Sequence, residues 1–179
     1  MRSLSFGAVA LLVLSAAGCG TSAPCPATTA AEEPMPDPGV PPGYVHVEVL
    51  GVLPTQQGNA LLLRGDRMDH LLPIFIGDAE ANAIEMRLAG QRFDRPLTHD
   101  LLDTIMGDLG GEMVRVLVNK LRGDVFLGTV VVRQGDRYFS IDARPSDAVA
   151  LAVGSGCPVF VSTHLLESTG LPLDRTPPP

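Results

Sequence analysis

The sequence contains no tryptophan and few aromatic residues of any kind. Only 4% of its 179 residues are aromatic whereas 45% are hydrophobic, so a folded core has to be built mainly from aliphatic side chains. Beyond residue 17, no apolar run reaches the length of about 20 residues that a membrane-spanning helix needs. Self-similarity at the periods of solenoid repeats is also absent. These absences favour one aliphatic domain of about 130 residues.

Cysteine is scarce as well, with three copies at Cys19, Cys25 and Cys157. The spacing of the cysteines and histidines fits no structural zinc site. Cys19 ends the stretch SAAGC, which is typical of a bacterial lipobox and follows Arg2 and the apolar residues 4–17. We therefore predict that residues 1–19 are a lipoprotein signal and that Cys19 is lipidated. An ordinary secretory signal with a chance cysteine is the alternative.

The segments that flank the domain are rich in proline and small polar residues. Residues 20–42 are expected to form a disordered Pro/Ala/Thr tether, residues 43–169 the domain, and residues 170–179 a Pro-rich tail. The protein would then be exported from the cytoplasm and anchored to a membrane of the bacterial cell envelope. Because exported proteins meet oxidising conditions, Cys25 and Cys157 either form a disulfide or stay separate, with Cys157 buried.

Basic residues are outnumbered by acidic ones. The chain has 13 Lys and Arg against 20 Asp and Glu, a formal charge of −7, and removal of the signal with Arg2 makes it −8. Nucleic-acid-binding proteins usually have a basic surface, so this charge opposes general polyanion binding. A local group within the domain can still bind phosphate, and its candidates are Arg87, Arg92, Arg95, Arg115, Lys120, Arg122, Arg133, Arg137 and Arg144.

Apolar patterning predicts the secondary structure. Strands are expected at residues 44–50, 59–64, 70–76, 112–121, 124–133, 137–142 and 159–161. Helices are expected at residues 79–89 after an Asp78 cap, from a Thr98 cap to Gly110, from Pro145 to about Gly154, and briefly after Thr163. Runs of strands with helices between some of them predict an α+β (mixed α/β) fold, with one mixed β-sheet covered by about three helices.

Apolar spacing also predicts which helix faces are buried. In the first helix, Ala83, Ile84 and Leu88 are expected to face the core. In the second helix, the same expectation holds for Leu101, Leu102, Ile105 and Leu109.

Two polar strings interrupt the apolar domain. Residues 95–102 read RPLTHDLL, and residues 141–152 read IDARPSDAVALA. Each string places Arg-Pro before a hydroxyl residue and an Asp, at the start of an expected helix. Helix N-termini attract anions, arginine forms two parallel hydrogen bonds with phosphate, and carboxylates bind hard cations. The two helix starts are therefore the candidate site.

A third segment belongs with the two strings. Residues 72–84 read LPIFIGDAEANAI. Together the three resemble the motifs of the bifunctional nuclease domain family: LPI-x-IG-x-x-EA-x-AI, then RPxTHDLL, then IDARPSDA. The resemblance extends over roughly residues 44–168. It implies the mixed fold of that family and cleavage of DNA or RNA.

The polar residues admit a functional and a structural interpretation. In the functional one, Asp100, Asp142, Asp147 and Glu80 bind Mg²⁺ or Mn²⁺ beside a phosphodiester. The catalytic residues are then His99, Asp100 and Asp147, with His99 as general acid or base, and the substrate-binding residues are Arg95, Arg144 and Ser146. In the structural one, Thr98, Ser146 and Asp147 cap helices, while Arg95 and Arg144 form buried pairs with Asp100 and Asp142.

We therefore expect a membrane-anchored, bifunctional nuclease-like protein that uses a divalent metal, Mg or Mn. Its expected partners are the membrane, nucleic acid and other copies of itself in a homo-oligomer. The alternative is a non-catalytic envelope lipoprotein whose domain binds a protein partner or a small ligand. Polar side chains gathered around an open pocket favour the first function, and closed, buried ion pairs favour the second.

Overall fold

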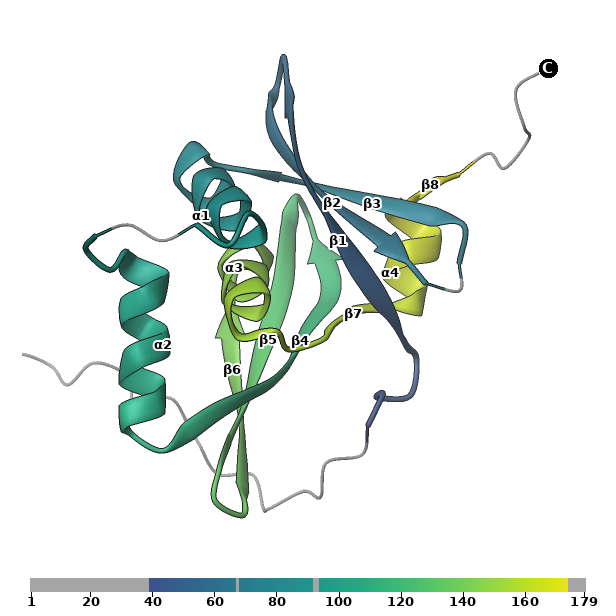
Figure 1. Cartoon of the computed structure of the whole chain (residues 1–179). Helices are drawn as coiled ribbons and strands as arrows, with labels where there is room; N and C mark the ends of the chain where they lie inside the picture. The colour runs from purple at the N-terminus through teal and green to yellow at the C-terminus, as the bar shows by residue number, and fades with distance from the viewer. Residues whose placement is uncertain (1–38, 67, 92–93, 174–179) are drawn as a thin grey trace, which may run out of the picture.

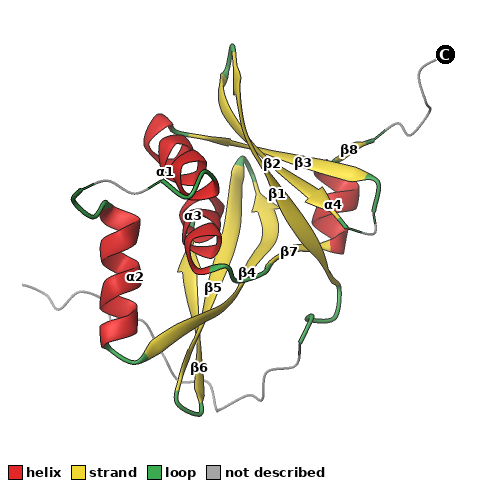
Figure 2. Ribbon diagram, in the orientation of Figure 1, coloured by secondary structure: helices red, strands yellow, loops and turns green. Residues whose placement is uncertain are grey.

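The computed structural model describes residues 39–66, 68–91 and 94–173. Within these residues, four helices accompany one mixed sheet of eight strands (Figures 1 and 2). The predicted α+β single-domain fold is thereby confirmed. No helix in the described part of the chain is long and apolar enough to cross a bilayer.

The helices and strands follow the expected order. The strands are β1 (Tyr44–Thr55), β2 (Gly58–Gly65), β3 (His70–Ile76), β4 (Gly111–Arg122), β5 (Val125–Gln134), β6 (Arg137–Ala143), β7 (Val159–Ser162) and β8 (Leu171–Pro172). The helices are α1 (Asp78–Leu88), α2 (Thr98–Asp108), α3 (Pro145–Ser155) and α4 (Thr163–Thr169). Only the two-residue strand β8 has no counterpart in the sequence-based assignment.

Two antiparallel meanders, β1–β2–β3 and β4–β5–β6, are joined by β7 in the middle of the sheet. The strand order is β6-β5-β4-β7-β1-β2-β3-β8. Strand β7 pairs antiparallel with β1 and parallel with β4. The chain reaches β7 from the edge strand β6 through α3, and this crossover lays α3 over β4 and β5.

One face of the sheet forms the hydrophobic core. Cross-strand partners such as Leu63 and Leu72, or Val116 and Val159, are at most 4% exposed, and they alternate with more exposed residues. The same cluster contains Ile84 of α1, several residues of α3, and Leu166 of α4. The aliphatic core expected from the composition is therefore present.

Helix α2 differs from the expectation. Its large apolar side chains point to solvent, with exposed fractions of 54% for Leu101, 47% for Leu102, 45% for Ile105 and 68% for Leu109. The residues nearest the body of the domain are polar or flexible: His99, Asp100, Asp103 and Met106 are partly buried. The prediction that the leucines face inward is wrong, because the inner side of α2 meets charged groups of α1 and α3.

Several smaller expectations are also wrong. Leu88 is 42% exposed and does not belong to the inner face of α1. Asp78, Thr98 and Thr163 lie inside their helices, and the N-cap residues are Gly77, Leu97 and Ser162, whose own side chains form no capping hydrogen bond. In α3 the N-cap residue is Arg144, and Pro145 begins the helix as expected.

Candidate functional site

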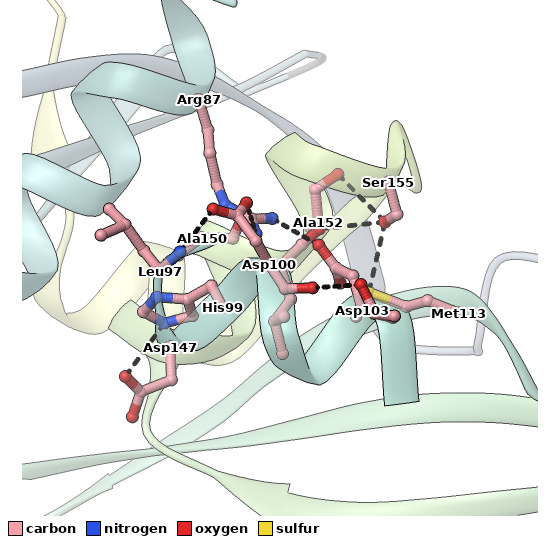
Figure 3. A network of polar contacts seen from close by, with 12 residues as sticks. Arg87, Leu97, His99, Asp100, Asp103, Met113, Asp147, Ala150, Ala152 and Ser155 are labelled. Carbon is pink, nitrogen blue, oxygen red and sulfur yellow. Dashed lines mark hydrogen bonds and ion pairs between the residues drawn. The ribbon is translucent and has the colours of Figure 1, made fainter. Parts of the chain in front are cut away.

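The polar residues of the two strings meet where α1, α2 and α3 come together (Figure 3). The α3 crossover brings its first turn beside the first turn of α2, and α1 packs along α3. Residues in direct contact here are up to 64 positions apart in the sequence. Their proximity is therefore a product of the sheet topology.

A continuous line of polar contacts connects the three helices. His99 Nε2 of α2 lies 3.4 Å from Asp147 Oδ1 of α3. Arg144 donates to both oxygens of Asp147, from Nε at 2.6 Å and from a terminal nitrogen at 3.0 Å. The same terminal nitrogen donates to Glu80 Oε1 of α1 at 2.7 Å. Glu80, Arg144, Asp147 and His99 therefore form one polar chain.

Exposure varies along this polar chain. The side chain of Arg144 is 66% exposed, whereas those of Asp147, Glu80 and His99 are 31%, 17% and 15% exposed. Hydrogen bonds to Asp147, and then to Glu80, raise the pKa of Arg144 above its usual value. The guanidinium is thus a permanent charge at the surface, with a partly buried His–Asp pair beside it.

A second polar group lies on the other side of His99 and centres on Arg87. This arginine contacts Asp100 Oδ1 and Asp103 Oδ2, each at 2.8 Å, and donates to the carbonyl of Ala150 at 3.1 Å. Its side chain is only 9% exposed. Asp100 also accepts the backbone N–H of Leu97 at 3.0 Å, and so it satisfies a free donor at the start of α2. An open polar hollow of about 250 Å³ borders this group.

The structure places the predicted site residues in separate groups. Glu80, Arg144, Asp147 and His99 lie together, whereas Asp100 faces Arg87. Ser146, predicted to bind substrate, is 7% exposed in the first turn of α3.

Two predicted site residues lie apart. Arg95, before α2, and Asp142, on β6, are exposed, and neither side chain has a hydrogen bond or ion pair within the described ranges. The structural interpretation paired Arg95 with Asp100 and Arg144 with Asp142. These pairings are wrong, because Asp100 pairs with Arg87 and Arg144 with Asp147 and Glu80.

Asp103 was missed by the sequence reasoning, and Arg87 was included there only as a general phosphate-binding candidate. Arg87 follows Ala83 by four residues and Ile84 by three, which places it on the buried stripe of α1. An arginine on such a stripe needs a carboxylate partner. The position of Arg87 on this stripe could have predicted a buried ion pair. Asp100 and Asp103, three residues apart on one side of α2, could have been predicted as its partners.

The predicted metal ligands do not form one cluster. Among residues 39–66, 68–91 and 94–173, no group of three or more His, Cys, Asp or Glu side chains is arranged to hold a metal ion. Two of the four predicted acids, Glu80 and Asp147, contact one nitrogen of Arg144. Their carboxylate oxygens suit a hard cation, and the guanidinium now supplies the positive charge between them.

Cys157 is a free, partly buried thiol just before β7. Burial raises the pKa of this thiol above its usual value, which disfavours the reactive thiolate. Cys25, its predicted disulfide partner, lies outside the described residues, as does the lipidation candidate Cys19.

Comparison with known proteins places this region inside a matched segment. Residues 61–174 match the family described as "Bifunctional nuclease domain". Two relatives are uncharacterized proteins of Mycobacterium tuberculosis, from two strains. Each is 38% identical to this chain over 127 residues, which cover 70% of this chain and 76% of the relative. The matched segment includes all three helices that form the candidate site.

Proposed function

Because the chain belongs to the bifunctional nuclease domain family, we propose that it hydrolyses phosphodiester bonds of DNA or RNA where α1, α2 and α3 meet. The observation that carries the proposal is the His99–Asp147 pair at 3.4 Å, next to the 66% exposed Arg144. A base held by a carboxylate, with a cationic group beside it, is a common arrangement for moving a proton at a charged substrate.

Each residue of the polar chain has a distinct role in this proposal. Asp147 fixes the orientation of the His99 ring through Nε2, which leaves Nδ1 to exchange a proton with water or the leaving oxygen. Arg144 binds a phosphate oxygen from its exposed position. Glu80 holds the guanidinium of Arg144 in place.

The charge of the polar chain supports the use of a divalent metal. Glu80 and Asp147 carry two negative charges against the single positive charge of Arg144, and a phosphodiester adds another negative charge. Glu80 and Asp147 hold Arg144 in the arrangement described, and they would be the acids to bind Mg²⁺ or Mn²⁺ beside His99 when Arg144 turns from them to a phosphate oxygen. Such an ion would supply an acidic water and stabilise the leaving oxygen.

The proposal includes the location of the protein. The lipobox that ends at Cys19 would anchor the protein to a membrane of the bacterial envelope, with the Pro-rich residues 20–42 between the lipid and the domain. Nucleic acid would then be met outside the cytoplasm.

A second candidate function is protein binding without catalysis. The exposed fractions of 45–68% for Leu101, Leu102, Ile105 and Leu109 favour it, because a row of exposed leucines on one helix is typical of a partner-binding surface. The closed Arg87 ion pairs also agree with a purely structural role for part of the polar cluster.

A cleavage assay separates the two candidates. The detergent-solubilised full-length protein should cleave labelled single-stranded DNA or RNA with Mg²⁺ or Mn²⁺, stop with a chelator, and weaken steeply with salt. Asp147→Asn should lower the rate about 100-fold or more. The matched control is Asp136→Asn, an exposed turn residue between β5 and β6, which should leave the rate unchanged.

Two results would decide against the nuclease proposal. Cleavage near the wild-type rate when Asp147→Asn and His99→Ala are combined would assign the activity to a contaminant or to another site. A folded protein that cleaves nothing with either metal would favour the protein-binding function.

A further inference from the structure

Helix α2 has little apolar contact with the rest of the domain. None of its residues is fully buried, and its large aliphatic side chains point to solvent. Only Met106 of α2 packs against the hydrophobic core. The attachment of α2 therefore depends on polar contacts, and α2 is the element that carries His99.

Arg87 is the centre of these polar contacts. Its guanidinium joins three helices, because it extends from α1 to Asp100 and Asp103 of α2 and to the Ala150 carbonyl of α3. On the side of α3, the guanidinium packs closely against Gly154. A Cβ atom added to Gly154 would lie 1.8 Å from a terminal nitrogen of Arg87, so this glycine leaves the room that the guanidinium fills.

The contact of Arg87 with Asp100 acts directly on the position of His99. Asp100 is the next residue in the chain, and its second oxygen holds the N–H of Leu97. Leu97 and Asp100 therefore fix the backbone on both sides of His99. Without the Arg87 pairs, the 3.4 Å approach of His99 to Asp147 would be the main remaining polar link between α2 and α3.

We propose that Arg87 is a positioning residue that holds α2 in place and thereby keeps His99 beside Asp147. The inference rests on the proposed function only for its effect on cleavage, since the positioning itself concerns side chains in the folded protein. Lysine should replace Arg87 poorly, because one ammonium group cannot reproduce the planar, multi-donor geometry of a guanidinium.

The test is an NMR measurement of the His99 ring in the full-length protein in detergent micelles. Asp147→Asn should shift the ring signals of His99 in the otherwise unchanged protein, because the two side chains are in contact. In an Arg87→Ala background, the same substitution should shift them at least tenfold less. Backbone amides of α2 should lose at least tenfold more protection in Arg87→Ala than those of β4 and β5, whose loss follows the fall in global stability.

Two further variants keep the test decisive. Arg133→Ala removes an exposed arginine that pairs with Glu112, and it should leave the response of His99 unchanged. If Arg87→Ala does not fold, Arg87→Gln takes its place, since a glutamine can still donate to the Ala150 carbonyl but cannot form the two ion pairs.

The outcomes distinguish this inference from the nuclease proposal. An equal response of His99 to Asp147→Asn with and without Arg87 would overturn the positioning role, even if Asp147→Asn abolished cleavage. Loss of protection in β4 and β5 to the same extent as in α2 would also overturn it, because Arg87 would then serve the whole fold. If the protein cleaves nucleic acid, Arg87→Ala should lower kcat with little change in KM.

Discussion

Arg87 and Arg144 each contact two carboxylates, but water reaches them to very different extents. The side chain of Arg87 is 9% exposed and that of Arg144 is 66% exposed. A charge removed from water depends on its partners, whereas an exposed ion pair is weakened by solvent. The structural interpretation of the sequence predicted buried ion pairs at Arg144. The structure has them at Arg87 instead.

The two arginines should therefore differ in their effect on stability. Arg87→Ala should lower the free energy of unfolding by about 2–4 kcal/mol, because Asp103 and the Ala150 carbonyl lose their buried partner. Arg144→Ala should lower it by less than about 1 kcal/mol. Urea unfolding followed by circular dichroism measures both, and equal losses would show that the difference in exposure is unimportant.

At the scale of elements, the sequence predicted the sheet well. The strands could be found because buried and more exposed residues alternate along much of β2 and β4, and because β5 has a short run of buried valines. Helix α2 was misread because its apolar stripe, Leu101, Leu102, Ile105 and Leu109, has the spacing of a buried face. The stripe that really faces inward is polar, and no local pattern reveals that its partner is Arg87 of another helix.

The candidate site was predicted in part for the same reason. The motifs identified the starts of α2 and α3, and the fold brings Glu80, His99, Arg144 and Asp147 together there. The sequence could not show that Asp100 faces Arg87 or that Asp142 lies apart on β6, because both depend on how α1 and α3 pack against their neighbours.

Two glycines test the packing of these helices. Gly154→Ala should destabilise the protein by about 1–3 kcal/mol, because the new Cβ would lie 1.8 Å from Arg87 and displace it. Gly107→Ala in α2 is the matched control. Its Cβ would meet no atom within 4 Å, and the higher helix propensity of alanine should stabilise the protein by up to about 1 kcal/mol. Thermal unfolding of both variants checks this prediction. An equal gain in stability for both would show that Arg87 does not pack closely against Gly154.

At the scale of the whole molecule, net charge and location set the conditions for any nucleic-acid chemistry. The chain has a formal charge of −7, so a polyanionic substrate is repelled at long range and has to be held by a few local contacts. A membrane anchor would further restrict the substrates to those outside the cytoplasm.

The anchor itself is testable through Cys19. Cys19→Ser should release the protein from the membrane fraction or leave an uncleaved precursor, because the serine cannot carry the thioether-linked lipid. Fractionation of cells and the mass of the product measure this result. Unchanged processing and membrane retention in the variant would contradict the lipobox assignment.

The central claim is that His99 and Asp147 act as one unit in phosphodiester cleavage, and a double-mutant cycle tests it most directly. His99→Ala and Asp147→Asn should each lower kcat/KM by about 10²–10⁴-fold. The double variant should lose no more than the more damaging single variant, because either change already disables the pair. Losses that multiply, or cleavage near the wild-type rate in the double variant, would contradict the account.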